Sequence, residues 1–570
     1  MGILHPLVMR LPDAAWQSLF WKIIWLTEMI VLVLAIAFIL RFFNLATVPP
    51  AVDWDEASTA YNAYSILKTG RDEYGKSFPF LFRAFDGYVP PALIYLNVPS
   101  IKIFGLNALG ARVPNATLGS LTVVGFYFLL FELTRRKNLA STGALLLAIS
   151  PWHVTYSRVD FFATLPIFFV VFATYFLLRG LNKNKFLVLS SLFFVLAILS
   201  YFSAYVFVPL FVIALVFIYK EKLGLKRAFV FTAPIFLMTV FILIFSNGGQ
   251  ARFKGVSAFS DQDIIKESSE FARQDGLIGS VIDNRRIVYG QKFLEGYFAS
   301  FRFDFLFGKV DQITRMVVPG AGFGLMLWWD LPFLLAGLYF LLNKKPNGWK
   351  VILIWLVLSP IAAAPTLPQM TSTRTTLMIP ALVALTSYGF YFSIKSKGKL
   401  VKGILTLLLA FNFVIFANGY FRHFAHENSG KWFYGYRDLF TFLNRVENSS
   451  KKVYFVFKQP DILDQVYMFN LFYNRVDPAA WQKNGGTKLG CIATTGQVTL
   501  ERYNFVPYAC LEKPMGWSLV SDNDLVVVSK DLGVNPVDVV KFLNRDNAFY
   551  VYRYGNAKES LASEIKKKEL

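Results

Sequence analysis

Three carboxylates cluster at Asp53-Trp54-Asp55-Glu56, a few residues after the first hydrophobic segment of the chain. A carboxylate in such a loop can take a proton from an acceptor hydroxyl group, or can hold a metal ion that binds a phosphate. Asp55 and Glu56 are adjacent, so on a helix their side chains would point about 100° apart and need not share a ligand. The alternative is that all three carboxylates only solvate a loop.

Other ionisable residues lie beside apolar segments, where a charge usually has a partner or a function. Arg158 and Asp160 stand between two such segments. Arg158 could pair with Asp160, or its guanidinium could bind a phosphate. Arg374 precedes another apolar segment, and could bind a lipid phosphate or reach ordinary headgroups. A second acidic pair, Asp72-Glu73, lies in a glycine-flanked stretch and is expected to form a structural turn.

The composition of the chain indicates a membrane protein. Of its 570 residues, 55% are hydrophobic and 17% are aromatic, with 59 phenylalanines and only 17% charged residues. Runs of about 18 apolar residues are long enough to cross a bilayer as helices. We identify eleven predicted spans, at about 23–43, 113–133, 139–156, 164–179, 186–203, 205–219, 228–246, 323–343, 351–367, 376–394 and 403–420.

The basic residues predict the orientation of these spans. The net charge of +21 gathers in short linkers, which is typical of the cytoplasmic side of a membrane protein. These basic linkers are 135–137, 183–185, 220–227, 344–345 and 395–402. The N-terminus is then cytoplasmic, and loops 44–112 and 247–322 lie outside. The C-terminus is also outside because the number of spans is odd. The apolar stretch 90–104 is expected to form an interfacial helix on the outer face.

Residues 1–420 thus form the predicted membrane domain, and the tail 421–570 differs in character. Strand-like runs at 452–457 and 524–528 alternate with helix-like runs at 432–445 and 535–544. This pattern predicts a small extracytoplasmic α/β domain. The two cysteines, Cys491 and Cys510, both lie in this tail. An oxidising outer face would permit a disulfide between them, and two buried free thiols are the alternative.

The chain resembles the GT-C superfamily of membrane glycosyltransferases, and within it the protein O-mannosyltransferases and the lipid A aminoarabinose transferases. The general plan of that superfamily covers nearly the whole chain. The matching residues are Asp55-Glu56-Ala57, Pro90-Pro91, Ala111-Arg112-Val113-Pro114, Ser150-Pro151 and Arg158. Val89 stands where the family often has His or Lys before the two prolines, so a cationic role at that position is absent.

The resemblance implies that a sugar moves from a polyprenyl phosphate to an acceptor on the outer face, usually with inversion. It implies that Asp55 is the central carboxylate with Glu56 in support. It also implies that Asp160 assists from the second outer loop, at 157–163. The residues expected to bind substrate are Tyr61, Arg112, Arg158 and Arg374. Metal dependence varies in the family, so no cofactor is specified and a divalent metal is possible.

The expected partners are a polyprenyl-phosphate sugar donor, an acceptor that is a lipid, a protein or a glycan, and the plasma membrane, with no nucleic acid. The sequence contains no Walker loop, no glycine-rich dinucleotide loop after a strand and no His-Glu-x-x-His motif, so a nucleotide as direct donor is unsupported. The alternative function is a non-enzymatic transporter or flippase for lipid or polysaccharide. Transporters tend to place ionisable sites near the bilayer midplane in paired halves. Here the charged residues of the candidate site gather in outer loops instead.

Overall fold

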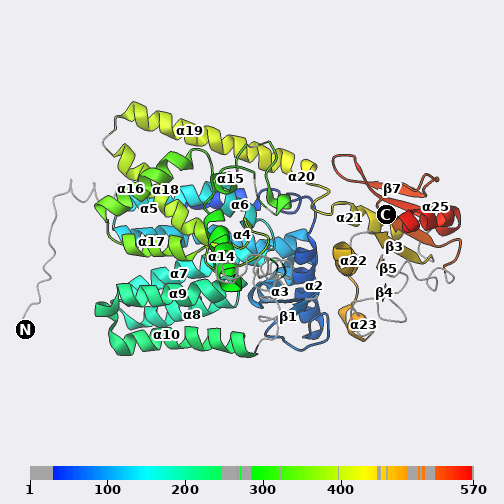
Figure 1. Ribbon diagram of the computed structural model, residues 1–570, viewed down its shortest axis with the longest axis horizontal. Coiled ribbons are helices and arrows are strands. Elements are labelled where there is room, and N and C mark those ends of the chain that lie inside the picture. Colours follow the sequence, from blue (N-terminus) through cyan, green and yellow to red (C-terminus); the bar gives the residue numbers. More distant parts are fainter. Residues whose placement is uncertain are drawn as a thin grey trace, which may run out of the picture.

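The computed structural model is a bundle of apolar helices with a mixed sheet at one end (Figure 1). Among the described residues, five helices are long and apolar enough to cross a membrane: Ala108–Thr134, Phe162–Gly180, Lys220–Ile244, Thr376–Ile394 and Lys399–Glu427. With the shorter apolar helices between them, they make the chain a multi-pass membrane protein. The structure describes residues 30–85, 87–245, 266, 270, 284–309, 311, 313–320, 322–395, 397–445, 451–457, 460–483, 498–500, 503–507 and 520–567.

A helix lies in each of the eleven predicted spans. In chain order these helices are Ile30–Phe42, α4 (Ala108–Thr134), α5 (Lys137–Ile149) with α6 (Pro151–Ser157), α7 (Leu165–Gly180), α8 (Asn184–Ile198), α9 (Phe202–Ile218), α10 (Lys220–Phe245), α16 (Asp330–Lys344), α17 (Trp349–Leu358), α18 (Ile379–Ile394) and α19 (Lys399–Asn418). The span expected at 139–156 is divided because Pro151 lacks an amide hydrogen and fits only the first turn of a new helix. The number of helices that cross the membrane stays a prediction.

The first outer loop is mostly helical. It contains α2 (Trp54–Thr69), the short hairpin of β1 (Phe82–Ala84) and β2 (Gly87–Val89), and α3 (Ala92–Phe104). α3 occupies the stretch predicted as an interfacial helix. The loop expected at 247–322 contains α14 (Arg285–Ala299) and α15 (Phe303–Leu306) among its described residues.

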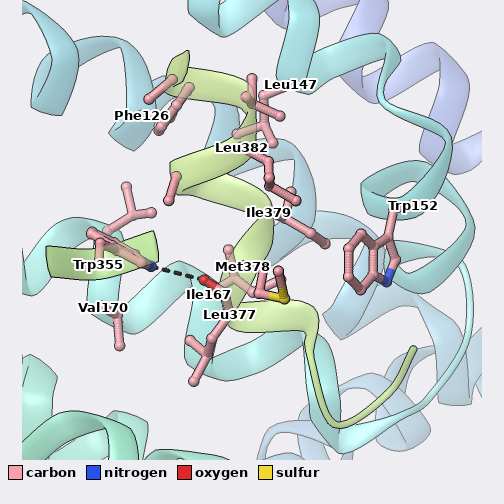
Figure 2. Packing of buried hydrophobic residues seen from close by; sticks show 14 of the residues in the cluster. Phe126, Leu147, Trp152, Ile167, Val170, Trp355, Leu377, Met378, Ile379 and Leu382 are labelled. Carbon is pink, nitrogen blue, oxygen red and sulfur yellow. Dashed lines mark hydrogen bonds between the residues drawn. The ribbon is translucent and has the colours of Figure 1, made fainter. Parts of the chain in front are cut away.

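The core of the bundle is filled by large apolar side chains from several helices, as Figure 2 shows for residues of α4 to α7, α17 and the start of α18. Trp355 of α17 lies in this core and donates a hydrogen bond from its indole nitrogen to the carbonyl oxygen of Leu377, at 2.8 Å. The bond satisfies a polar group that would otherwise be costly to bury.

Two glycines allow α16 and α18 to cross at backbone distance. A Cβ atom on Gly337 would lie 1.9 Å from the carbonyl oxygen of Leu385, and one on Gly389 would lie 1.8 Å from a backbone oxygen of α16. Small residues at such crossings are typical of helices that pack inside membranes.

The basic linkers and the sheet lie at opposite ends of the bundle. Near the linkers, Arg136 lies 5.1 Å from the ring centre of Phe392, and Lys344 lies 4.9 Å from the same ring. At the other end α2 packs against α22 (Pro460–Tyr473) of the tail. Figure 1 shows α19 running from the linker end toward the sheet. The loop 44–112 and the tail therefore share one end of the molecule, as the predicted orientation requires.

The tail forms a six-stranded sheet in the order β4-β5-β3-β6-β8-β7, in which β5, β3 and β6 are parallel and the outer neighbours are antiparallel. The strands are β3 (Val453–Phe457), β4 (Val498–Leu500), β5 (Tyr503–Pro507), β6 (Leu525–Val528), β7 (Asp538–Lys541) and β8 (Asn547–Arg553). Helices α21 (Gly435–Leu443) and α22 pack on one face, and α25 (Tyr554–Lys567) packs on the other.

The predicted strands at 452–457 and 524–528 and the predicted helix at 432–445 are confirmed as β3, β6 and α21. The helix predicted at 535–544 is wrong, because Asp538–Lys541 is the edge strand β7. Its two β-branched residues, Val539 and Val540, pair with Tyr550 and Phe549 of β8. Cys491 and Cys510 lie outside the described residues. Their disulfide and the domain boundary near residue 420 stay predictions.

We predict that the N-terminus is cytoplasmic and that the C-terminus is outside. Short loops rich in Lys and Arg are retained in the cytoplasm, and the odd number of predicted spans then places the tail outside. A periplasmic-type reporter fused after Leu570 should be active, and the same reporter fused after Lys345 should be inactive. Activity only after Lys345 would reverse the orientation.

Candidate active site

The acidic cluster forms the first turn of α2. Asp53 is the N-cap, because its carboxylate accepts a hydrogen bond from the backbone N–H of Asp55 at 3.0 Å, and the Glu56 carboxylate accepts one from the N–H of Asp53 at 3.0 Å. This reciprocal capping box fixes where the helix begins. Asp53 and Glu56 are fully buried, whereas the side chain of Asp55 is 46% exposed. Asp55 is thus the member of the cluster that solvent or a substrate can reach.

Glu56 and Arg112 form a buried ion pair. Arg112 Nε and Nη2 donate to the two oxygens of Glu56 at 2.9 and 2.8 Å. The same carboxylate also accepts the backbone N–H of Asp160 at 2.9 Å. Arg112 donates further to the carbonyl oxygens of Leu45, Pro49 and Ala51. The geometry therefore favours positioning roles for Glu56 and Arg112, rather than the catalytic and substrate-binding roles expected for them.

Arg315 is the functional candidate that sequence reasoning missed. Its Nη1 lies 3.2 Å from Asp53 Oδ2, and its Nη2 lies 3.7 Å from Asp55 Oδ2. The guanidinium also stands over the rings of Trp54 and Phe161, with centroid distances of 5.1 and 5.3 Å. Burial raises the pKa of Asp53, and the charge of Arg315 opposes that rise. The one available signal was indirect, since buried carboxylates need a cation.

Asp160 lies close to the cluster and ties α2 to α3. Its carboxylate accepts hydrogen bonds from the hydroxyl of Thr59 and from Asn97 Nδ2, the latter at 2.7 Å. Burial raises the pKa of Asp160 well above its usual range. Its other oxygen, Oδ1, is buried without a hydrogen-bond partner among the described residues. The structure thus brings Asp160 beside Glu56 but seals it from solvent.

Arg158 does not pair with Asp160. Its Nη1 and Nη2 donate to the carbonyl oxygens of Leu40 and Val48 at 2.8 and 2.9 Å, and its guanidinium stands 4.9 Å from the ring centre of Phe421. Through these two hydrogen bonds, the Arg158 guanidinium stabilises the connection between the helix Ile30–Phe42 and α2. Its role as a phosphate clamp stays a prediction that this geometry does not favour.

Tyr61 and Arg374 lie elsewhere. Tyr61 is fully buried on α2, and its hydroxyl donates to the carbonyl oxygen of Val476 in the tail at 3.1 Å. Arg374 is half-buried before α18, and its Nη1 donates to the carbonyl oxygen of Leu367 at 2.9 Å and to that of Pro368 at 3.3 Å. Tyr61 therefore belongs to the contact with the α/β unit, while Arg374 holds the turn that precedes α18.

A second polar group of residues lines a small cavity near Arg315. Ser372 donates to the Asp311 carboxylate, and its hydroxyl also shares a hydrogen bond with the hydroxyl of Tyr156. The cavity, of about 20 Å³, is lined by Tyr156 and Asp311 together with Trp152, Lys309 and Met316. It offers hydroxyl, carboxylate and ammonium groups beside aromatic rings.

Comparisons with known proteins agree with this architecture. A family model described as dolichyl-phosphate-mannose-protein mannosyltransferase matches residues 88–246. YkcB of Bacillus subtilis (strain 168), named as a candidate mannosyltransferase, is 28% identical over 143 residues, which are 24% of this chain and 20% of YkcB. The match thus spans only about a fifth of that relative's length.

Two solved structures are similar to the chain. ArnT from Cupriavidus metallidurans, in a structure bound to undecaprenyl phosphate, has a TM-score of 0.50 at 13% identity, over 92% of this chain and 98% of ArnT. The archaeal oligosaccharyltransferase AglB from Archaeoglobus fulgidus has a TM-score of 0.45 at 15% identity, over 79% of this chain and 64% of AglB. At this low identity, the likeness to ArnT shows a shared fold.

The family model begins after the acidic cluster. It includes Pro90-Pro91, Arg112, Arg158 and Asp160, but it does not include Asp55. A role for Asp55 therefore rests on the geometry and on the residue pattern. Within the described part of the chain, no group of three or more His, Cys, Asp or Glu residues is placed to hold a metal ion. The positive charge that faces Asp53 and Asp55 is the guanidinium of Arg315.

The pair Asp72-Glu73 has a structural position. Asp72 accepts the backbone N–H groups of Tyr74 and Lys76 at 3.0 and 2.8 Å, which confirms the predicted turn. Glu73 is fully buried and accepts a hydrogen bond from the hydroxyl of Tyr467 in the α/β unit at 3.3 Å. Burial raises the pKa of Glu73 to about 8, although hydrogen bonds oppose the rise.

This raised pKa predicts that the protein loses stability as the pH rises. Between the pKa of the unfolded chain, about 4.3, and the folded value, the native state keeps a proton that the unfolded state releases, so stability falls with pH. The penalty is on the order of 5 kcal/mol above that window. Glu73→Gln should remove most of it, which the unfolding temperature in detergent at pH 5 and pH 8 would measure.

Glu559→Gln is the matched control, because Glu559 is exposed on α25. It should leave the difference between the two unfolding temperatures unchanged. A pH dependence that survives Glu73→Gln in full would mean that other groups cause it.

Proposed function

We propose that the protein is a membrane glycosyltransferase that moves a sugar from a polyprenyl-phosphate donor to an acceptor hydroxyl group at the outer face, with Asp55 as the general base. The observation that carries this proposal is the exposure of Asp55 between two buried carboxylates, with Arg315 beside it. The lipid phosphate in the ArnT structure supports the donor class. The names of the family model and of YkcB make mannose the first sugar to test.

The reaction we propose is an inverting displacement. Asp55 takes the proton of the acceptor hydroxyl, and the oxygen of that hydroxyl forms a bond to the anomeric carbon. The bond between that carbon and the phosphate oxygen breaks, and its electron pair leaves with the lipid phosphate. Arg315 orients the Asp55 carboxylate and adds positive charge near the leaving group, where charge develops in the transition state.

The other residues of the cluster hold this arrangement in place. Asp53 binds Arg315 from the buried side, at 3.2 Å, so the guanidinium remains beside Asp55. Glu56 and Arg112 fix the first turn of α2. A transporter, the alternative, would move lipid or glycan across vesicles without forming a glycosidic bond, and purified protein assayed with a polyprenyl-phosphate sugar separates the two.

Asp55→Asn should abolish transfer and leave the fold intact. An amide cannot accept the hydroxyl proton, and loss of a general base usually costs about 10² to 10⁴ in rate. Asp72→Asn is the control, because Asp72 serves a turn and its amide variant can still accept a backbone N–H. Turnover at the wild-type rate in Asp55→Asn would remove Asp55 from the mechanism.

Arg374→Ala should raise the KM for the lipid donor and leave that for the acceptor nearly unchanged. A charge-assisted contact with phosphate is worth about 1.5–3 kcal/mol, or about tenfold to a hundredfold in affinity. Steady-state kinetics with donor and acceptor varied separately would measure this. Arg302→Ala is the control, since Arg302 pairs with exposed Asp304. An unchanged donor KM would mean that Arg315, and not Arg374, provides the contact with the phosphate.

A further inference from the structure

The segment Asn428–Phe433 joins the membrane helices to the α/β unit, and it reaches the loop that carries Arg315. Trp432 is fully buried, and its Nε1 donates a hydrogen bond to the backbone oxygen of Arg315 at 2.9 Å. Asn428 Nδ2 donates to the backbone oxygen of Val317 at 3.0 Å. Two side chains of one segment thus hold the backbone of the Arg315 loop.

The same segment backs the two rings under the Arg315 guanidinium. Phe161 stacks on Trp432, with ring centres 6.1 Å apart and planes at 11°. Trp54 packs on Phe433, with ring centres 4.7 Å apart. The side chain and the backbone of Arg315 therefore both depend on two consecutive residues of the segment that leads into the α/β unit.

This dependence matters because an arginine side chain has many rotamers. Ordering such a side chain costs up to about 2 kcal/mol of conformational entropy. A cation held over aromatic rings and anchored at its backbone has already met that cost before a substrate binds. Without the anchors, the guanidinium would sample positions away from Asp55, to which it now lies at 3.7 Å.

We propose that Trp432 is a positioning residue for Arg315, so that sugar transfer depends on the docking of the α/β unit through the segment Asn428–Phe433. The part of this proposal that concerns catalysis rests on the proposed function. The part that concerns the Arg315 loop does not, because it can be measured without any reaction.

The first test compares two tryptophan-to-phenylalanine variants. Trp432→Phe keeps an aromatic ring and removes the donor to Arg315. Trp481→Phe is the matched control. Trp481, like Trp432, is buried, but it lies in the α/β unit and its Nε1 has no hydrogen-bond partner among the described residues. Trp432→Phe should lower kcat about tenfold, within the range that misplacing a catalytic group costs. Trp481→Phe should change kcat less than twofold.

A double-mutant cycle then separates positioning from a general loss of structure. If Trp432 acts through Arg315, Trp432→Phe should change the residual single-turnover rate less than twofold in an Arg315→Met background. Asn428→Ala, which removes only the bond to Val317, should give a smaller loss in the same direction. Rate losses that multiply independently in the Trp432→Phe, Arg315→Met pair would overturn the proposal.

Hydrogen exchange provides the readout that needs no activity. Backbone amides in 313–318 should exchange faster in Trp432→Phe than in the wild type, and should be unchanged in Trp481→Phe. Equal exchange in all three proteins would overturn the docking contact. A wild-type protein without transfer activity would overturn the proposed function alone, and the exchange experiment would still decide whether Trp432 holds the Arg315 loop.

Discussion

The buried ion pair between Glu56 and Arg112 is the interaction on which the outer end of this bundle depends. Burying two charges is expensive, and the attraction between them repays the cost only when their remaining donors and acceptors are also satisfied. Here both carboxylate oxygens and the guanidinium have partners, which are the N-cap of α2, the backbone of Asp160 and the carbonyls of the loop before α2. One pair thus joins α2, α4, the loop before α2 and the loop that carries Asp160.

Because of this ion pair, the neighbouring carboxylates have different surroundings. Glu56 has no oxygen left for a substrate, and Asp53 is buried against Arg315. Asp55 remains at the surface with its carboxylate held toward one cation. A general base needs both access to the acceptor and a defined orientation, and Asp55 combines the two. Asp160, which the resemblance suggested as an assisting carboxylate, is buried beneath this surface and bonded to Asn97, and its assisting role stays a prediction.

The sequence predicted the helices well because long apolar runs leave few alternatives, and it located the acidic cluster because charges are rare beside such runs. The sequence did not show which charged side chains pair with each other in the fold. Arg112 and Arg158 were both expected to bind substrate, yet Arg112 pairs with a carboxylate and Arg158 donates to backbone carbonyls. Arg315 lies far from Asp55 along the chain, so only tertiary packing could pair them. The edge strand Asp538–Lys541 was mistaken for helix because a four-residue strand has too little periodicity to be distinguished.

In the proposed mechanism, Asp55 and Arg315 face the reacting end of a lipid-linked sugar. The most direct measurement is an experimental structure of the full chain with a non-hydrolysable polyprenyl-phosphate sugar analogue bound. We expect a phosphate oxygen within hydrogen-bonding distance of the Arg315 guanidinium, and the anomeric carbon open to an acceptor oxygen held by Asp55 at about 3–3.5 Å. A phosphate bound at the end of the bundle that carries the basic linkers, or an analogue that leaves Asp55 remote from the anomeric carbon, would contradict this mechanism.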